Sequence, residues 1–195
     1  MWSPLKELVT RVNAGDDSLE TRLRRLEDDI AIRNVLNRYT YCYDASDLDG
    51  VMDAFHQDCV LVNPRGTYVG ADLVRRNYRH LISTRKFSFH HISNDVVSVS
   101  DDGIEAGFSS YFNCVIAFRS GALAGSSGTY VCRLLQDAGL WKIREMRITL
   151  NTRQSLTPGP SAVIAPSDSP DAPPAPPAPT IAEGSRDWIG PDALA

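Results

Sequence analysis

Apolar residues recur every three or four positions between residues 18 and 43. The positions are Leu19, Leu23, Leu26, Ile30, Ile32, Leu36, Tyr39 and Tyr43. Such spacing places side chains along one side of a helix, so the pattern predicts an amphipathic helix over this stretch. Asp17 and Glu20, three residues apart, have the spacing of a capping box at its start.

Shorter patterns follow between residues 47 and 83. They predict a short helix over 47–55, a strand over 59–62, a turn over 64–66 and a helix over 71–83. From Lys86 onward the period changes to two, which is typical of strands. We expect strands over 87–100, 104–119, 121–136 and 140–151, joined by short turns. Two of these turns read Asp-Asp-Gly and Asp-Ala-Gly. Short turns predict an antiparallel hairpin meander.

Helices that precede a long antiparallel sheet predict an α+β fold class, in which the helices cover one face of the sheet. A strongly curved sheet with a helix across its mouth forms a cone-shaped barrel. Because such a cone is open inside, it can enclose a ligand pocket.

Proline divides the chain into parts. Ten of the twelve prolines follow Arg153, and a segment such as APPAPPAP cannot build a core. We therefore expect an N-terminal extension over 1–17, one folded domain over 18–153, and a Pro/Ala-rich tail over 154–195. The tail is expected to be largely extended or disordered, although Trp188 and Ile189 could dock on the body.

Charge and cysteine usage exclude several classes of protein. The net charge is −4 with interleaved signs, which argues against a nucleic-acid or anionic-membrane surface. The four cysteines, Cys42, Cys59, Cys114 and Cys132, are widely spaced in apolar stretches, as buried thiols are in a reducing compartment. No apolar run reaches the length of a signal-peptide core or a membrane helix, so we expect a cytoplasmic protein.

Two short segments of the sequence carry candidate acid/base residues. Tyr39 and Tyr43 share a helix face, and Asp44 follows at the bend. His90 and His91 fall in a strand, where neighbours point to opposite faces, so only one of them can face inward. An inward histidine beside Asp44 would form an acid/base pair. The alternative is structural: a capping Asp and a hydrogen-bonded histidine. The four histidines show no metal-ligand spacing, so we expect no metal site.

Three segments carry a family resemblance: LEDDIAIRNVLNRYTYCYDASDLDGVMDAF, HHISNDVV and GLWKIREMRI. Together they resemble the SnoaL-like branch of the nuclear transport factor 2 superfamily, over about residues 19–153. Scytalone dehydratase, bile-acid 7α-dehydratase and hexachlorocyclohexane dehydrochlorinase belong to this group. The resemblance implies a cone-shaped α+β barrel that works without cofactor or metal. It also implies a homo-oligomer, with a trimer favoured and a dimer as the alternative.

The resemblance also implies roles for single residues. His91 matches the histidine that removes a proton in these enzymes, and Tyr43 with Asp44 stands where scytalone dehydratase has its Tyr-Asp pair. Tyr39 matches the tyrosine of the bile-acid enzyme, and Asn113 falls where that enzyme has a further aspartate. The chain departs from scytalone dehydratase in two places, which makes scytalone an improbable substrate. Asn63 stands near its strand tyrosine, and residues 125–128 read Gly-Ser-Ser-Gly where it has a second histidine.

These observations predict a lyase, or an isomerase, that acts on a hydrophobic cyclic or aromatic small molecule. His91 would be the general base, oriented by Asp44, and Tyr39 would donate a hydrogen bond where negative charge develops. Tyr43, Asn113 and Asn63 would contact the substrate. Two alternatives remain open: a non-catalytic subunit or binding module of the same fold, like the small subunits of ring-hydroxylating dioxygenases, and a polyketide cyclase.

Overall fold

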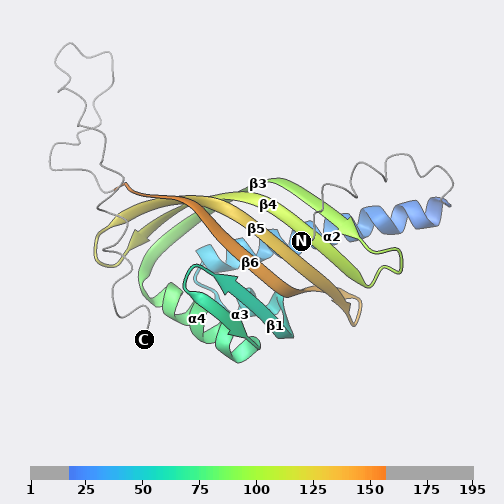
Figure 1. The fold of residues 1–195 in the computed structure, drawn as a ribbon, viewed down its shortest axis with the longest axis horizontal. Helices are drawn as coiled ribbons and strands as arrows, with labels where there is room; N and C mark the ends of the chain where they lie inside the picture. Colours follow the sequence, from blue (N-terminus) through green and yellow to red (C-terminus); the bar gives the residue numbers. More distant parts are fainter. Residues whose placement is uncertain (1–17, 157–195) are drawn as a thin grey trace, which may run out of the picture.

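The structure is a computed structural model that describes residues 18–156 (Figure 1). Its elements are α2 (Leu19–Asp44), α3 (Leu48–Asp53), β1 (Phe55–Asn63), β2 (Gly66–Val69), α4 (Ala71–Ser83), β3 (Arg85–Val99), β4 (Glu105–Phe118), β5 (Leu123–Asp137) and β6 (Leu140–Ser155). The expected N-terminal extension and nearly all of the Pro/Ala-rich tail, including Trp188 and Ile189, lie outside the described residues.

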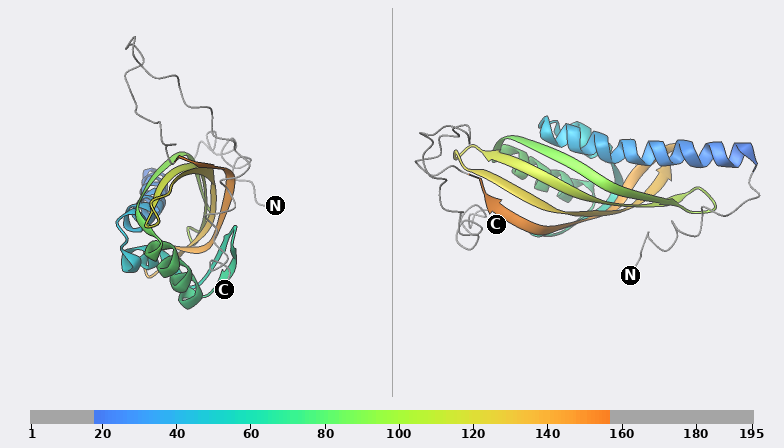
Figure 2. Two further views of the ribbon diagram at one scale, coloured as in Figure 1. Left: turned by 90° about the vertical axis from the view of Figure 1, so that its left-hand side faces the viewer. Right: turned by 90° about the horizontal axis from the view of Figure 1, so that it is seen from above.

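The six strands form one mixed sheet in the order β2-β1-β6-β5-β4-β3. Strands β3 to β6 pair antiparallel with their sequence neighbours, which confirms the predicted meander. β1 instead lies parallel to β6, and β2 forms a hairpin with β1. The sheet curves strongly without closing, and the helices lie along one side of it (Figure 2). The predicted α+β fold class is therefore confirmed.

Helix α2 has two halves with different surroundings. Leu19, Leu23, Leu26 and Ile30 in its first half are exposed, although their spacing predicted a buried face. This half projects beyond the sheet in Figures 1 and 2. The second half buries Ile32, Leu36, Tyr39 and Tyr43 against the sheet and α4. The helix begins at Ser18, whose hydroxyl accepts from the Thr21 N–H at 3.2 Å, rather than at the predicted cap Asp17.

None of the helices within residues 18–156 is both long and apolar enough to span a membrane.

An irregularity in β6 decides which of its side chains face the helices. Ser127 pairs with Thr152, whereas Gly128 pairs with Leu150, so Asn151 is an extra residue in the ladder. Such a bulge reverses the alternation of side chains beyond it. Arg153 therefore lies on the same face of the sheet as Ile148 and Leu150.

Candidate active site

A cavity of about 130 Å³ lies between the inner face of the sheet, helices α2 and α4, and the β1–β2 turn. Four tyrosine side chains border it, together with an apolar wall from β4 and β6 and a polar set that includes both charged and hydroxyl groups. The tyrosines are Tyr39, Tyr43, Tyr78 and Tyr130, the wall includes Phe112, Ile116, Ile148 and Leu150, and the polar set is Asn63, Arg65, His90, Ser126 and Arg153. A concave apolar site with a few convergent polar groups is typical of small-molecule binding.

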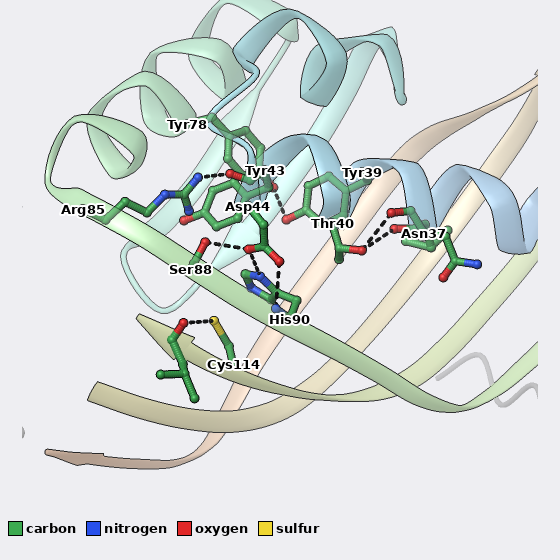
Figure 3. A network of polar contacts seen from close by, with 12 residues as sticks. Asn37, Tyr39, Thr40, Tyr43, Asp44, Tyr78, Arg85, Ser88, His90 and Cys114 are labelled. Atoms are coloured by element: carbon green, nitrogen blue, oxygen red, sulfur yellow. Dashed lines mark hydrogen bonds and ion pairs between the residues drawn. The ribbon is translucent and has the colours of Figure 1, made fainter. Parts of the chain in front are cut away.

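Asp44 and His90 form a hydrogen-bonded pair beside this cavity (Figure 3). Asp44 is the last residue of α2, and β3 supplies all three of its donors. The His90 Nδ1 lies 2.6 Å from Oδ1, the Ser88 hydroxyl donates to Oδ1 at 2.6 Å, and the His90 backbone N–H donates to Oδ2 at 2.8 Å. The end of the helix is thus tied to the strand through one carboxylate.

These bonds determine the protonation of the pair. Burial raises the pKa of Asp44, but the bonds and charge of His90, together with the Ser88 hydroxyl, outweigh burial and lower the pKa below its usual value. Asp44 is therefore ionised at neutral pH and can only accept hydrogen bonds. When the His90 imidazole is neutral, the proton of that contact sits on Nδ1 and the lone pair is left on Nε2. An imidazole held in this tautomer can take up a proton there.

The predicted pairing of His91 with Asp44 is wrong. His91 lies on the outer face of the sheet, where it is exposed and its ring contacts Phe89, with centroids 4.8 Å apart. Its strand partner Asn113 is exposed on the same outer face, so the structure does not bring Asn113 to the cavity either. Both predictions failed for one reason: β3 and β4 place alternate residues inside, and here His90 and Cys114 are the inner pair.

Tyr39, predicted to donate a hydrogen bond where negative charge develops, is buried and borders the cavity from α2. Its hydroxyl lies 2.9 Å from the Tyr78 hydroxyl of α4, a partner that sequence reasoning missed. Burial raises the pKa of both phenols, so both remain protonated at neutral pH. One of the two hydroxyls donates to the other, which leaves the second O–H free to donate to a bound molecule.

Tyr43 also borders the cavity, and a buried cation lies on its ring. The Arg85 guanidinium carbon is 3.5 Å from the ring centroid, and Nη2 donates to the Tyr43 carbonyl oxygen. Among the described residues, the Nε and Nη1 atoms of Arg85 have no hydrogen-bond partner. Burial raises the pKa of Tyr43 to about 12, against the opposing effect of the Arg85 charge. Arg85 thus makes this phenol a stronger donor than burial alone would leave it.

Two remaining lining residues bear on the chemistry. Burial raises the pKa of the Cys114 thiol to about 12, so this thiol is not a nucleophile at neutral pH. Asn63, predicted to contact substrate, does border the cavity, and its Oδ1 accepts the Arg65 N–H at 2.9 Å. Within residues 18–156, no group of three His, Cys, Asp or Glu side chains is placed to hold a metal ion.

Residues 24–147 match the profile of the SnoaL-like domain family. The chain belongs to this family. The match covers more than half of the chain and includes both Asp44 and His90. It agrees with the family resemblance of the sequence. Among curated proteins, no sequence matches the chain significantly.

Solved structures show the same SnoaL-like architecture. A candidate scytalone dehydratase from Novosphingobium aromaticivorans has a TM-score of 0.63 at 18% identity, covering 70% of this chain and 91% of its own. Hexachlorocyclohexane dehydrochlorinase LinA-type3 from Novosphingobium barchaimii has a TM-score of 0.63 at 14% identity, covering 69% and 94%. A protein of unknown function with a cystatin-like fold, from Nostoc punctiforme, has a TM-score of 0.55 at 18% identity, covering 63% and 90%. At these sequence identities the similarity shows a shared fold and no more.

Proposed function

We propose that this protein is a lyase or an isomerase. Its own side chains remove a proton from a small, mainly apolar cyclic molecule. The single observation that carries the proposal is the Asp44–His90 pair at the edge of an aromatic-lined cavity. A SnoaL-like fold shared with a dehydrochlorinase and a candidate dehydratase is consistent with this class of reaction.

The first step in this mechanism breaks a C–H bond next to a carbonyl group. The Nε2 atom of His90 takes the proton, and the Asp44 carboxylate stabilises the resulting imidazolium. The electron pair moves onto the carbonyl oxygen. There the free hydroxyl proton of the Tyr39–Tyr78 pair and the Tyr43 hydroxyl donate hydrogen bonds, where negative charge develops. His90 is the catalytic residue in this scheme, and Asp44 is a positioning residue.

The second step has two forms that use the same side chains. In an elimination, the enolate electrons form a C=C bond, the bond to a β-hydroxyl breaks, and the imidazolium returns its proton to the leaving oxygen, which gives water. In an isomerisation of a β,γ-unsaturated ketone, the electrons shift back from the carbonyl oxygen through the neighbouring C=C bond, the imidazolium returns its proton to the γ-carbon, and no group leaves. Both forms use the Asp44–His90 pair, because one histidine can act first as a base and then as an acid.

The size of the cavity supports a substrate with a single ring. An engineered apolar cavity of roughly 150 Å³ binds benzene, and the cavity here is about 130 Å³. Of the Gly-Ser-Ser-Gly stretch at residues 125–128, only Ser126 lines the cavity. We therefore propose monocyclic rather than polycyclic substrates.

Two alternatives from the sequence have less support. A polyketide cyclase would be supported by an acidic residue on the sheet side of the cavity, and no Asp or Glu is among the described residues that line it. A non-catalytic binding module of this fold would have no need of an ionised carboxylate that orients an imidazole at a cavity wall. A sheet interior filled with side chains would favour that module, whereas here a cavity lies beside the Asp44–His90 pair.

The test uses a panel of monocyclic β-hydroxy and β-halo ketones in deuterated water. Elimination product and deuterium incorporation are measured for the native chain and for Asp44→Ala, with a thermal melt to verify folding. We expect at least one compound to react and Asp44→Ala to slow it by about a hundredfold. If no compound exchanges or eliminates, or if folded Asp44→Ala reacts at the native rate, the proposed function is wrong.

A further inference from the structure

Two arginine side chains border the same cavity as His90. Arg65 comes from the turn between β1 and β2, and Arg153 comes from β6. They belong to elements that are far apart in the sequence, and no described Asp or Glu side chain lines this cavity with them. Two positive side chains therefore border this mainly apolar cavity.

Local structure holds both arginines in place. The Asn63 side chain accepts the Arg65 N–H at 2.9 Å, which fixes the turn that carries Arg65. The bulge at Asn151 turns Arg153 toward the cavity, since regular alternation would have placed Thr152 there. Thr152 instead bonds the Ser127 hydroxyl on the outer face. Bulges often redirect a single side chain next to a functional site.

The two guanidinium groups are close enough to affect each other. Burial lowers the pKa of Arg153, and the positive charge of Arg65 lowers it further. The Arg65 charge also lowers the pKa of the Tyr43 phenol, by less than the Arg85 charge does. An anion placed between the two groups would reduce their repulsion. Guanidinium groups bind carboxylates through paired, planar hydrogen bonds.

We propose that Arg65 and Arg153 form an anion subsite that binds a carboxylate of the substrate. This inference rests on the proposed function, because it narrows the substrate of that site to a monocyclic carboxylate. The ring would lie against Phe112, Ile148 and Leu150, and the reacting carbon would face His90. The carboxylate would also fix the direction in which the ring enters. The two arginines would then discriminate charge, while the tyrosines and His90 perform the chemistry.

The test measures binding rather than turnover, with benzoate as the probe and benzamide as its neutral counterpart. Titration calorimetry on the native chain compares the two, and the variants are Arg65→Gln, Arg153→Gln and, to keep charge but lose the planar fork, Arg153→Lys. The matched control is Arg133→Gln, which removes an exposed arginine that pairs with Glu105 away from the cavity. Thermal melts verify that each variant folds.

We expect native protein to bind benzoate more tightly than benzamide, and each Gln variant to weaken benzoate by about tenfold or more. Arg153→Lys should fall between native and Arg153→Gln, and Arg133→Gln should bind like the native chain. Added salt should weaken benzoate and leave benzamide unchanged. Equal binding of the two probes, no binding of benzoate, or native affinity in folded Arg65→Gln and Arg153→Gln would each overturn the subsite.

A His90→Gln variant separates this inference from the proposed function. Binding of benzoate requires no proton transfer, so its dependence on Arg65 and Arg153 should persist in this variant. If ketones turn over but benzoate binding ignores both arginines, only the anion subsite is wrong. If benzoate binding depends on both arginines but no compound in the panel, with carboxylate-bearing rings added, ever reacts, only the lyase or isomerase function is wrong.

Discussion

The two faces of the sheet carry the same residue types in different surroundings. On the inner face, His90 is held by Asp44, its side chain is 7% exposed, and it borders the cavity. On the outer face, the next residue, His91, is exposed and contacts only the ring of Phe89 among aromatic groups. The two side chains are identical, so the candidate chemical role of His90 comes from its surroundings. One step along a strand is enough to change those surroundings.

The largest expected effect comes from removing each histidine in turn. His90→Gln should lower the rate with any compound that the native chain converts by about a hundredfold or more, because the general base is lost. His91→Gln should stay within about twofold of native, because His91 does not line the cavity that His90 borders. Steady-state rates on both variants measure the difference. Equal losses in the two variants would remove the distinction between the faces.

Glycines on the two faces provide a comparison of stability. A Cβ added to Gly128 on the inner face would lie 1.9 Å from the Thr149 carbonyl oxygen and 3.0 Å from the Phe112 ring. A backbone oxygen cannot move aside cheaply, so Gly128→Ala should lower the free energy of unfolding by about 3 kcal/mol.

Gly125 on the outer face is the matched control. An added Cβ there would meet the flexible end of the Leu156 side chain at 3.1 Å. Gly125→Ala should change the free energy of unfolding by less than about 1 kcal/mol. Urea unfolding of both variants decides the matter, and a Gly128→Ala protein as stable as Gly125→Ala would show that the inner face is less tightly packed than described.

A smaller effect is expected from two serines. Ser88 donates to the ionised Asp44 at 2.6 Å, so Ser88→Ala should cost about 1.5 kcal/mol at neutral pH, the usual size for a bond to a charged group. Ser127 on the outer face bonds the Thr152 hydroxyl at an exposed site, and Ser127→Ala should cost less than about 0.5 kcal/mol. Thermal or urea unfolding at pH 7 measures both changes.

The Ser88 effect should depend on pH with a definite sign. The pKa of Asp44 is lower in the folded chain than its usual value of about 3.9. Its ionised form therefore contributes stability that is fully present above about pH 4 and is lost as the pH falls through the lower, folded pKa. The gap in stability between native protein and Ser88→Ala should shrink over that acid range. A gap that stays constant or widens toward acid would contradict the hydrogen-bonded, ionised Asp44.

Much of the fold could be predicted from periodicity. The helix over 71–83 has the predicted bounds, and the strands of the meander lie within a few residues of them. The parallel pairing of β1 with β6 could not be predicted, because it joins segments distant in the chain and no local pattern encodes it. The exposed leucines of early α2 were misassigned because helical spacing alone does not say whether anything packs against that face.

The candidate site was predictable in part. The segment around Tyr39 and Asp44 correctly located the helix end that carries the carboxylate. The choice between His90 and His91 depends on the register of β3, which shifts between Arg85 and Phe87, and sequence alternation does not reveal such a shift. Arg153 was missed for the same reason, since the bulge at Asn151 reverses which residues of β6 face inward. Arg65, Tyr78 and Arg85 had no distinguishing local pattern.

One measurement tests most directly whether Asp44 and His90 form the pair on which the account depends. A proton–nitrogen correlation spectrum of ¹⁵N-labelled protein at neutral pH reports which ring nitrogen of each histidine carries the proton. We expect a hydrogen-bonded, downfield proton on Nδ1 of His90 that disappears in folded Asp44→Ala and persists in His91→Gln. If that proton belongs to His91, or if His90 carries it on Nε2 and is indifferent to Asp44→Ala, the central claim is contradicted.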